Sequence, residues 1–100
     1  MVNSYKLSPA AISDIETIVA YTDETFGVNQ TAAYIAGLES SFDLLVKFPG
    51  IGAAAFEVKP GLRRYRYQSH YIFYTQQGDF IGIEAVIHVS RSIRPDLFDT

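Results

Sequence analysis

The alternation of apolar and polar residues in the last third of the chain most constrains its fold. Phe80 to Val89 predicts a strand with one buried face, because every odd position from 81 to 89 is apolar. His70 to Thr75 predicts a preceding strand, and residues 76–79 are typical of the hairpin turn between them. Leu62 to Tyr67 predicts a further strand. Because strands joined by hairpins are antiparallel, we expect an antiparallel sheet.

The first half of the chain predicts a short strand and two amphipathic helices. Val2 to Leu7 has the alternation of a strand, and Ser8-Pro9 combines an N-cap with a proline suited to the first helical position. Gly27 is placed to end the first helix. Asn29 predicts the start of the second helix, and Pro49-Gly50 its end. Together these elements predict an αα-hairpin.

The element order predicts an α+β fold, β-α-α-β-β-β, in which the helical hairpin covers one face of the antiparallel sheet. The hairpin is the only cover that the sequence offers for the apolar face. Residues 53–56 fit either a partial strand or a turn of helix. With 100 residues, the chain suits one domain, residues 1–100, and leaves no room for a second.

Composition excludes several classes of protein. The chain has no cysteine, so it can form neither a disulfide framework nor a thiolate metal site. It lacks the charged start and apolar run of a signal peptide, and no apolar stretch approaches the roughly 20 residues of a membrane helix. We therefore expect a cytoplasmic protein that does not bind membranes.

Charge is unevenly distributed along the chain. Residues 1–58 hold two cations and seven anions, whereas residues 59–94 hold six cations and two anions. The formal net charge is −3, which is unlike a protein whose affinity rests on neutralising nucleic-acid phosphates. The basic half suits an acidic protein partner equally well.

Three arginines form the first candidate site. Arg63, Arg64 and Arg66 lie on one predicted strand, where Arg64 and Arg66 must share a face. Two interpretations remain open. The arginines either pair with acidic residues of the helices on a solvated face, or anchor the carboxylates or phosphates of a partner.

Two histidines form the second candidate site. His70 shares a face with Tyr74, and His88 shares one with Glu84 and Val86. If the two strands pair, two histidines and a tyrosine approach one another and could carry acid–base chemistry on RNA. We favour the simpler interpretation that both histidines are hydrogen-bonding residues at strand ends. Two histidines without close ligand spacing are a poor metal signal, and we expect neither a metal nor a cofactor.

An ordered set of short motifs resembles the ParE toxins of the RelE/ParE toxin–antitoxin superfamily over nearly the whole chain. In chain order these motifs are Tyr5-Lys6-Leu7-Ser8-Pro9-Ala10, Phe26-Gly27, Phe48-Pro49-Gly50-Ile51-Gly52, Pro60-Gly61-Leu62-Arg63-Arg64, Ser69-His70-Tyr71-Ile72-Phe73-Tyr74 and Ala85-Val86-Ile87-His88. The resemblance implies the fold described above.

The resemblance also implies that the protein acts by binding a target and not by catalysis. Such toxins inhibit DNA gyrase without catalysing a reaction, and a ParD-like antitoxin neutralises them by wrapping its C-terminal segment around the toxin. Operator DNA would be contacted only indirectly, through the antitoxin. The alternative is a RelE-like ribosome-dependent mRNA endonuclease, which shares the fold. A module that only binds an antitoxin is a third possibility.

The expected site has no catalytic residue and no metal ligand. Its partner-binding residues are Arg63, Arg64, Arg66, His70, Tyr71, Tyr74, His88, Arg91, Leu97 and Phe98. One position departs from the family pattern, which often has an arginine two residues after the final histidine. Here that position is Ser90, and the arginine is Arg91. The departure leaves open whether gyrase is the target.

Overall fold

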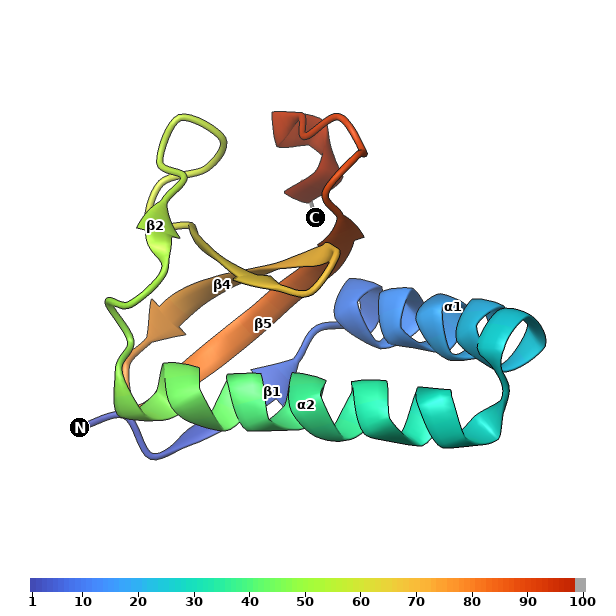
Figure 1. Ribbon diagram of the computed structural model, residues 1–100. Coiled ribbons are helices and arrows are strands. Elements are labelled where there is room, and N and C mark those ends of the chain that lie inside the picture. Colours follow the sequence, from blue (N-terminus) through green and yellow to red (C-terminus); the bar gives the residue numbers. More distant parts are fainter. Residues whose placement is uncertain (99–100) are drawn as a thin grey trace.

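The computed structural model describes residues 1–98; Asp99 and Thr100, the last two residues of the predicted domain, lie outside the described range. The described elements lie in the predicted order, with two short additions, one strand and one 3₁₀ turn (Figure 1). They are β1 (Ser4–Leu7), α1 (Pro9–Phe26), α2 (Val28–Lys47), β2 (Ala53–Ala54), β3 (Arg63–Tyr67), β4 (His70–Gln77), β5 (Phe80–His88) and the 3₁₀ turn η1 (Pro95–Phe98).

The strands form one five-stranded sheet in the order β1-β5-β4-β3-β2. β2 to β5 are antiparallel, as predicted, whereas β1 pairs with β5 in parallel, so the sheet is mixed. Residues 53–56 fit either a partial strand or a turn of helix in the sequence. The structure shows a short strand there, because Ala53 and Ala54 pair with Arg64 and Arg63. The α+β fold expected from the sequence is confirmed.

Local chemistry places the two helices. The Ser8 side chain accepts a hydrogen bond from the Ala11 N–H at 3.0 Å, and Pro9 occupies the first helical position. Gly27 has φ 89°, a conformation that L side chains rarely adopt. It ends α1 and also directly precedes α2, which begins at Val28, one residue before the predicted start.

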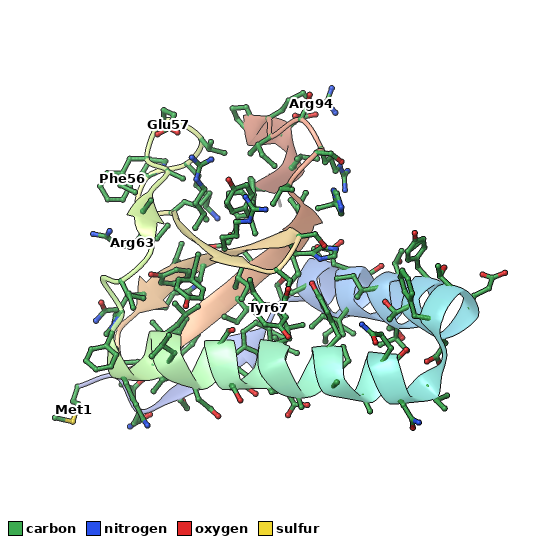
Figure 2. All side chains as sticks on the ribbon, viewed as in Figure 1. Met1, Phe56, Glu57, Arg63, Tyr67 and Arg94 are labelled. Atoms are coloured by element: carbon green, nitrogen blue, oxygen red, sulfur yellow. The ribbon has the colours of Figure 1, made fainter. Side chains whose placement is uncertain are left out.

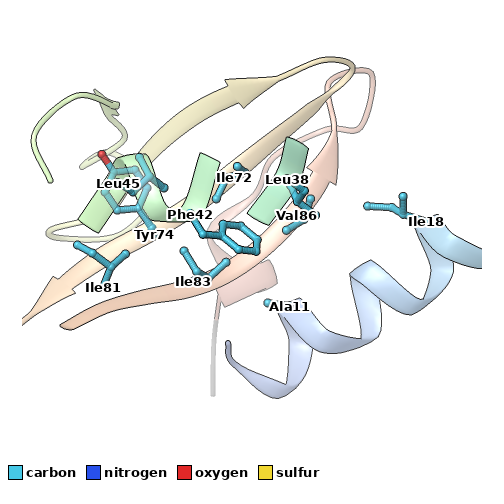
Figure 3. Packing of buried hydrophobic residues seen from close by; sticks show 10 residues of the cluster. All are labelled: Ala11, Ile18, Leu38, Phe42, Leu45, Ile72, Tyr74, Ile81, Ile83 and Val86. Carbon is cyan, nitrogen blue, oxygen red and sulfur yellow. The ribbon is translucent and has the colours of Figure 1, made fainter. Parts of the chain in front are cut away.

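A first apolar cluster fills the space between the helices and the sheet (Figure 3). Its fully buried members include Phe42 and Leu45 from α2 and Ile72 and Tyr74 from β4. We call this side of the sheet the helix face. Neither helix within residues 1–98 is both long and apolar enough to cross a membrane.

A β-bulge divides the apolar residues of β5 between the two faces of the sheet. Phe73 pairs with Ala85 and Tyr74 pairs with Ile83, so Glu84 is an extra residue in the ladder. Before the bulge, Ile83 packs into the helix-face cluster; after it, Ala85 packs on the other side. The prediction that all odd positions of this strand share one buried face is therefore wrong.

The opposite side, which we call the outer face, carries a second apolar cluster. It consists of Ala55, Leu62, Phe73, Ala85, Ile87 and Phe98. The loop between β2 and β3 and the C-terminal turn cover it, and both project away from the helices (Figure 1). Lys59 of that loop forms a 2.7 Å salt bridge with Glu84. The helical hairpin is thus not the only cover of the sheet, which corrects the expectation from the sequence.

Candidate functional site

The two histidines meet at the end of the β4–β5 hairpin on the helix face. His70 and His88 are direct cross-strand partners, with ring centroids 5.3 Å apart and ring planes at 84°. The predicted approach of the two histidines is confirmed. The expected tyrosine, Tyr74, is wrong, because the phenol at the pair belongs to Tyr34 of α2, which is hydrogen-bonded to His70 Nδ1. Glu84 does not belong to this group, because it pairs with Lys59 at the bulge.

Hydrogen bonds define which nitrogen of each histidine is free. The Ser90 N–H donates to His88 Nδ1 at 3.1 Å, so this nitrogen is an acceptor and the proton of the neutral ring lies on Nε2. Burial, and to a lesser extent Tyr67, raises the pKa of Tyr34 to about 12. Tyr34 therefore keeps its proton, and we assign it as the donor to His70 Nδ1. Burial and the neighbouring His88 lower the pKa of His70.

Tyr67 of β3 holds Tyr34 in place. Its hydroxyl donates a 3.0 Å hydrogen bond to the Tyr34 carbonyl, and the two rings lie 5.0 Å apart. Tyr67 lies on the sheet surface that meets α2 (Figure 2). There its ring packs directly onto Gly37, where a methyl group would overlap the phenol. The glycine in α2 is thus explained by the close approach of this ring.

A cavity of about 740 Å³ opens in front of the histidine pair, between the helical hairpin and the end of the sheet. It is lined by Thr17, Ile18, Tyr21, Thr22, Phe26, Gln30, Tyr34, Gln68, Ser69, His70, His88 and Ser90. Two aromatic rings of the lining are largely exposed, Tyr21 at 60% and Phe26 at 64%. No Asp, Glu, Lys or Arg belongs to the described lining. The cavity therefore combines an apolar wall with a floor of polar nitrogens.

The arginines lie mainly on the outer face. Arg64 and Arg66 pair across the sheet with Phe73 and Tyr71, which confirms that the two arginines share a face. The Arg64 guanidinium lies 4.9 Å from the centre of the Tyr71 ring, and Arg66 Nε donates to the Gln68 carbonyl at 2.9 Å. This cation–π contact positions the Arg64 guanidinium over the Tyr71 ring.

Arg63 points to the other side of β3 and lies at the β2 edge. It donates a 2.9 Å hydrogen bond to the Gly52 carbonyl and lies 5.5 Å from the Phe56 ring centre (Figure 2). Within residues 1–98 the salt bridges are Lys59–Glu84 and Arg94–Asp96. The interpretation that the three arginines pair with acidic residues of the helices is therefore wrong.

Two residues of the expected site are buried. Tyr74 has no exposed surface; its hydroxyl donates to the Pro49 carbonyl at 2.8 Å and accepts from the Gly52 N–H at 2.9 Å. Burial raises the pKa of this phenol, although the Gly52 N–H and Arg63 oppose the shift. Phe98 packs against Phe73, with ring centroids 5.1 Å apart. We leave both side chains out of the binding surfaces proposed below.

Arg91 is exposed and Leu97 is half-buried against the outer-face cluster. Burial raises the pKa of the Asp14 carboxyl of α1, although the hydrogen bond from the Val86 N–H and the positive charge of Arg91 oppose the rise. Within the described range no three His, Cys, Asp or Glu residues converge as metal ligands.

Sequence reasoning missed Tyr34, Tyr67 and Gly37 as parts of the site. Tyr34 carried one available signal, because it precedes the buried Leu38 by one helical turn and so lies near the apolar stripe of α2. Tyr67 carried another, since it continues the alternation of Tyr65 on β3. Nothing in the sequence indicates that the Tyr67 ring rests on Gly37, which lies 30 residues away.

Comparison with solved structures shows the class of fold, and comparison with other sequences shows the family. The fold is that of a solved structure titled "Chromosomal ParDE TA system from P. aeruginosa", with TM-score 0.75, 16% identity, and coverage of 90% of this chain and 98% of that one. This chain is 36% identical over 98 residues to Toxin ParE1 of Mycobacterium tuberculosis, covering 97% of this chain and all of the relative. It is 32% identical over 93 residues to Toxin ParE1 of Caulobacter vibrioides, covering 93% and 96%.

Residues 5–93 match the family described as "ParE toxin of type II toxin-antitoxin system, parDE". The chain therefore belongs to the ParE toxins of type II toxin–antitoxin systems, within the RelE/ParE superfamily. The resemblance found in the sequence motifs is confirmed.

Proposed function

We propose that this toxin acts in the cytoplasm by binding DNA gyrase, that it catalyses no reaction, and that a cognate ParD-type antitoxin neutralises it. Membership of the ParE toxins supports an antitoxin partner. Operator DNA would be reached only through the antitoxin. The whole of residues 1–100 would act as one toxin domain.

One observation carries the choice of binding over catalysis: the histidines and the paired outer-face arginines lie on opposite sides of the sheet. His70 and His88 meet on the helix face, whereas Arg64 and Arg66 lie with Tyr71 and Phe73 on the outer face. An RNA nuclease needs its acid, base and cationic groups within reach of one phosphate. Groups divided between two faces suit two binding surfaces instead.

The outer face suits gyrase in this proposal. Arg64 is held by Tyr71, Arg66 is exposed, and neither has a carboxylate partner within the described residues. A fixed guanidinium offers two parallel hydrogen bonds to a carboxylate at little cost in side-chain entropy. We expect this surface to anchor acidic residues of gyrase.

The cavity on the helix face suits the antitoxin. Its exposed Tyr21 and Phe26 provide the aromatic surface that protein interfaces favour, next to the polar histidine floor. A segment that folds on docking there would cover a large area with few residues. Antitoxin and gyrase would then use different faces of the toxin.

The proposal is tested with the purified toxin in two assays side by side. A supercoiling assay with purified gyrase should show inhibition that added antitoxin reverses. An mRNA cleavage assay on translating ribosomes should show intact message. Rapid ribosome-dependent cleavage together with unaffected supercoiling would instead establish the RelE-like endonuclease.

One observation favours the endonuclease as second candidate, namely the open His70–His88 pair beside Tyr34. If either histidine acts as general acid or base, His70→Gln or His88→Gln should lower a cleavage rate by about 10²–10⁴-fold. In the binding proposal neither change abolishes gyrase inhibition, because the histidines lie on the face assigned to the antitoxin.

A further inference from the structure

The floor of the helix-face cavity presents two hydrogen-bond donors. Nδ1 of His70 is engaged by Tyr34 and Nδ1 of His88 by Ser90, so Nε2 is the free nitrogen of each ring. Within residues 1–98 every buried side-chain nitrogen and oxygen has a partner. His70 Nε2 has no protein partner there, so it must be accessible to solvent, and His88 as a whole is exposed.

No acidic group competes for these donors. The other titratable side chains around the pair are the phenols Tyr21 of α1, Tyr34 of α2 and Tyr67 of β3, and none of them is a carboxylate. The Asp14 carboxylate of α1 accepts a hydrogen bond from the Val86 N–H and faces the positive charge of Arg91. An anionic group that enters the cavity would therefore meet two N–H donors and no like charge in its lining.

We propose that the antitoxin segment occupying this cavity places an Asp or Glu carboxylate on the Nε2 atoms of His70 and His88. The inference rests on the antitoxin docking proposed above. The carboxylate would sit at the polar floor, and apolar neighbours in the same segment would pack on Tyr21 and Phe26. An acidic residue flanked by apolar residues is thus the chemistry that this cavity selects.

Such a contact couples binding to protonation. In the free toxin the two rings lie 5.3 Å apart without a counter-charge, which opposes charging of both. A bound carboxylate supplies the counter-charge and favours the imidazolium form. The complex should therefore take up protons as it forms, and its affinity should rise as the pH falls through the histidine range.

The experiment measures the dissociation constant of the purified toxin and the antitoxin encoded with it from about pH 8 to about pH 6. The wild-type complex should tighten roughly tenfold, the effect of converting a neutral hydrogen bond into a charge-assisted one. His88→Gln and His70→Gln keep an N–H donor but cannot become charged. Each variant should lose at least half of the tightening, measured as the change in the free energy of binding between the two pH values.

Nuclear magnetic resonance provides a second readout. The chain contains two histidines, so their ring signals can be assigned with one variant each. Both pKa values should rise when the antitoxin binds. Replacing antitoxin Asp and Glu residues singly by Asn and Gln should identify one residue whose loss removes both the rise and the pH dependence.

An affinity that stays constant or weakens as the pH falls overturns the inference, as do histidine variants that keep the full wild-type pH dependence. A tight complex with constant affinity overturns the carboxylate contact alone and leaves antitoxin docking intact. Failure of any complex to form overturns the docking as well. Circular dichroism of both variants checks the fold; because His88 is exposed, His88→Gln remains a valid test even if His70→Gln is unstable.

Discussion

The two faces of the sheet differ in how they are covered and in what they leave exposed. The helix face lies under two long helices and ends in a cavity with an aromatic wall and a histidine floor. The outer face lies under a loop and one short turn, and it displays arginines beside Tyr71. A single residue, the extra Glu84 of the bulge, allows β5 to supply apolar residues to both. One small sheet can thus present two chemically distinct surfaces.

The largest expected effect tests whether the outer-face cluster is a true core. Phe73→Ala should destabilise the protein by about 3–5 kcal/mol, because Phe73 is fully buried against Phe98. Phe42→Ala on the helix face is the matched comparison and should cost a similar amount. Both are measured by urea unfolding. A loss below about 1 kcal/mol for Phe73→Ala alone would mean that the loop and turn do not hold the outer face closed.

The proposed docking of the antitoxin in the helix-face cavity is tested by changing an exposed aromatic side chain of its lining. Phe26→Ala should weaken antitoxin binding by about 2 kcal/mol or more, as expected for an aromatic anchor at an interface. The side chain is 64% exposed, so stability should change by no more than about 0.5 kcal/mol. Calorimetric titration gives the affinity. Exposed Phe48, away from the cavity, serves as the control, and an equal loss in Phe48→Ala would remove the cavity from the interface.

A variant of Tyr74 tests whether this buried side chain stabilises the fold or takes part in binding a partner. Tyr74→Phe removes the phenol that joins the Pro49 carbonyl and the Gly52 N–H, and it should lower stability by about 1–3 kcal/mol. Affinity for antitoxin and gyrase should be unchanged at a temperature where the variant is folded. Thermal unfolding and binding measured together check this. A stable variant with weakened binding would place Tyr74 in an interface after all.

The smallest effect concerns pH. The pKa of His70 is lowered in the folded toxin, so the unfolded chain binds more protons in the interval below the ordinary histidine pKa of about 6.5. The stability that neutral His70 contributes to the folded toxin is therefore complete above about pH 6.5. It is lost as the pH falls towards the lowered pKa of His70 in the folded state. Unfolding free energies of the wild type and His70→Gln, compared over this interval, should converge at lower pH. Parallel curves would contradict the assignment.

The sequence predicted the elements well because their signals are local. The Ser8 cap, the Gly27 joint and the Gly78 turn between β4 and β5 each act within a few residues. The bulge was not predictable in this way, since Glu84 looks like an ordinary polar position in a regular strand. It becomes visible only when the register against Phe73 and Tyr74 is known. The second cluster was missed for the same reason.

The candidate site was predicted in part. The His70–His88 pair followed from the hairpin, and the shared face of Arg64 and Arg66 followed from strand geometry. Tyr34 reaches the histidines from a helix 36 residues away, which no local pattern specifies. Tyr74 was placed at an interface because the motif containing it is conspicuous, yet its phenol closes a loop in the core.

The separation of the two faces is tested most directly by gyrase inhibition with the double variant Arg64→Ala/Arg66→Ala. Lys47→Ala, which removes one positive charge from an exposed position of α2, serves as the control for loss of positive charge elsewhere. The double variant should lose about 2–5 kcal/mol of gyrase binding, seen as a matching rise in the concentration that inhibits supercoiling, and should bind antitoxin as the wild type does. A folded double variant that inhibits gyrase fully, or that loses antitoxin and gyrase binding equally, would contradict the assignment of the two partners to opposite faces.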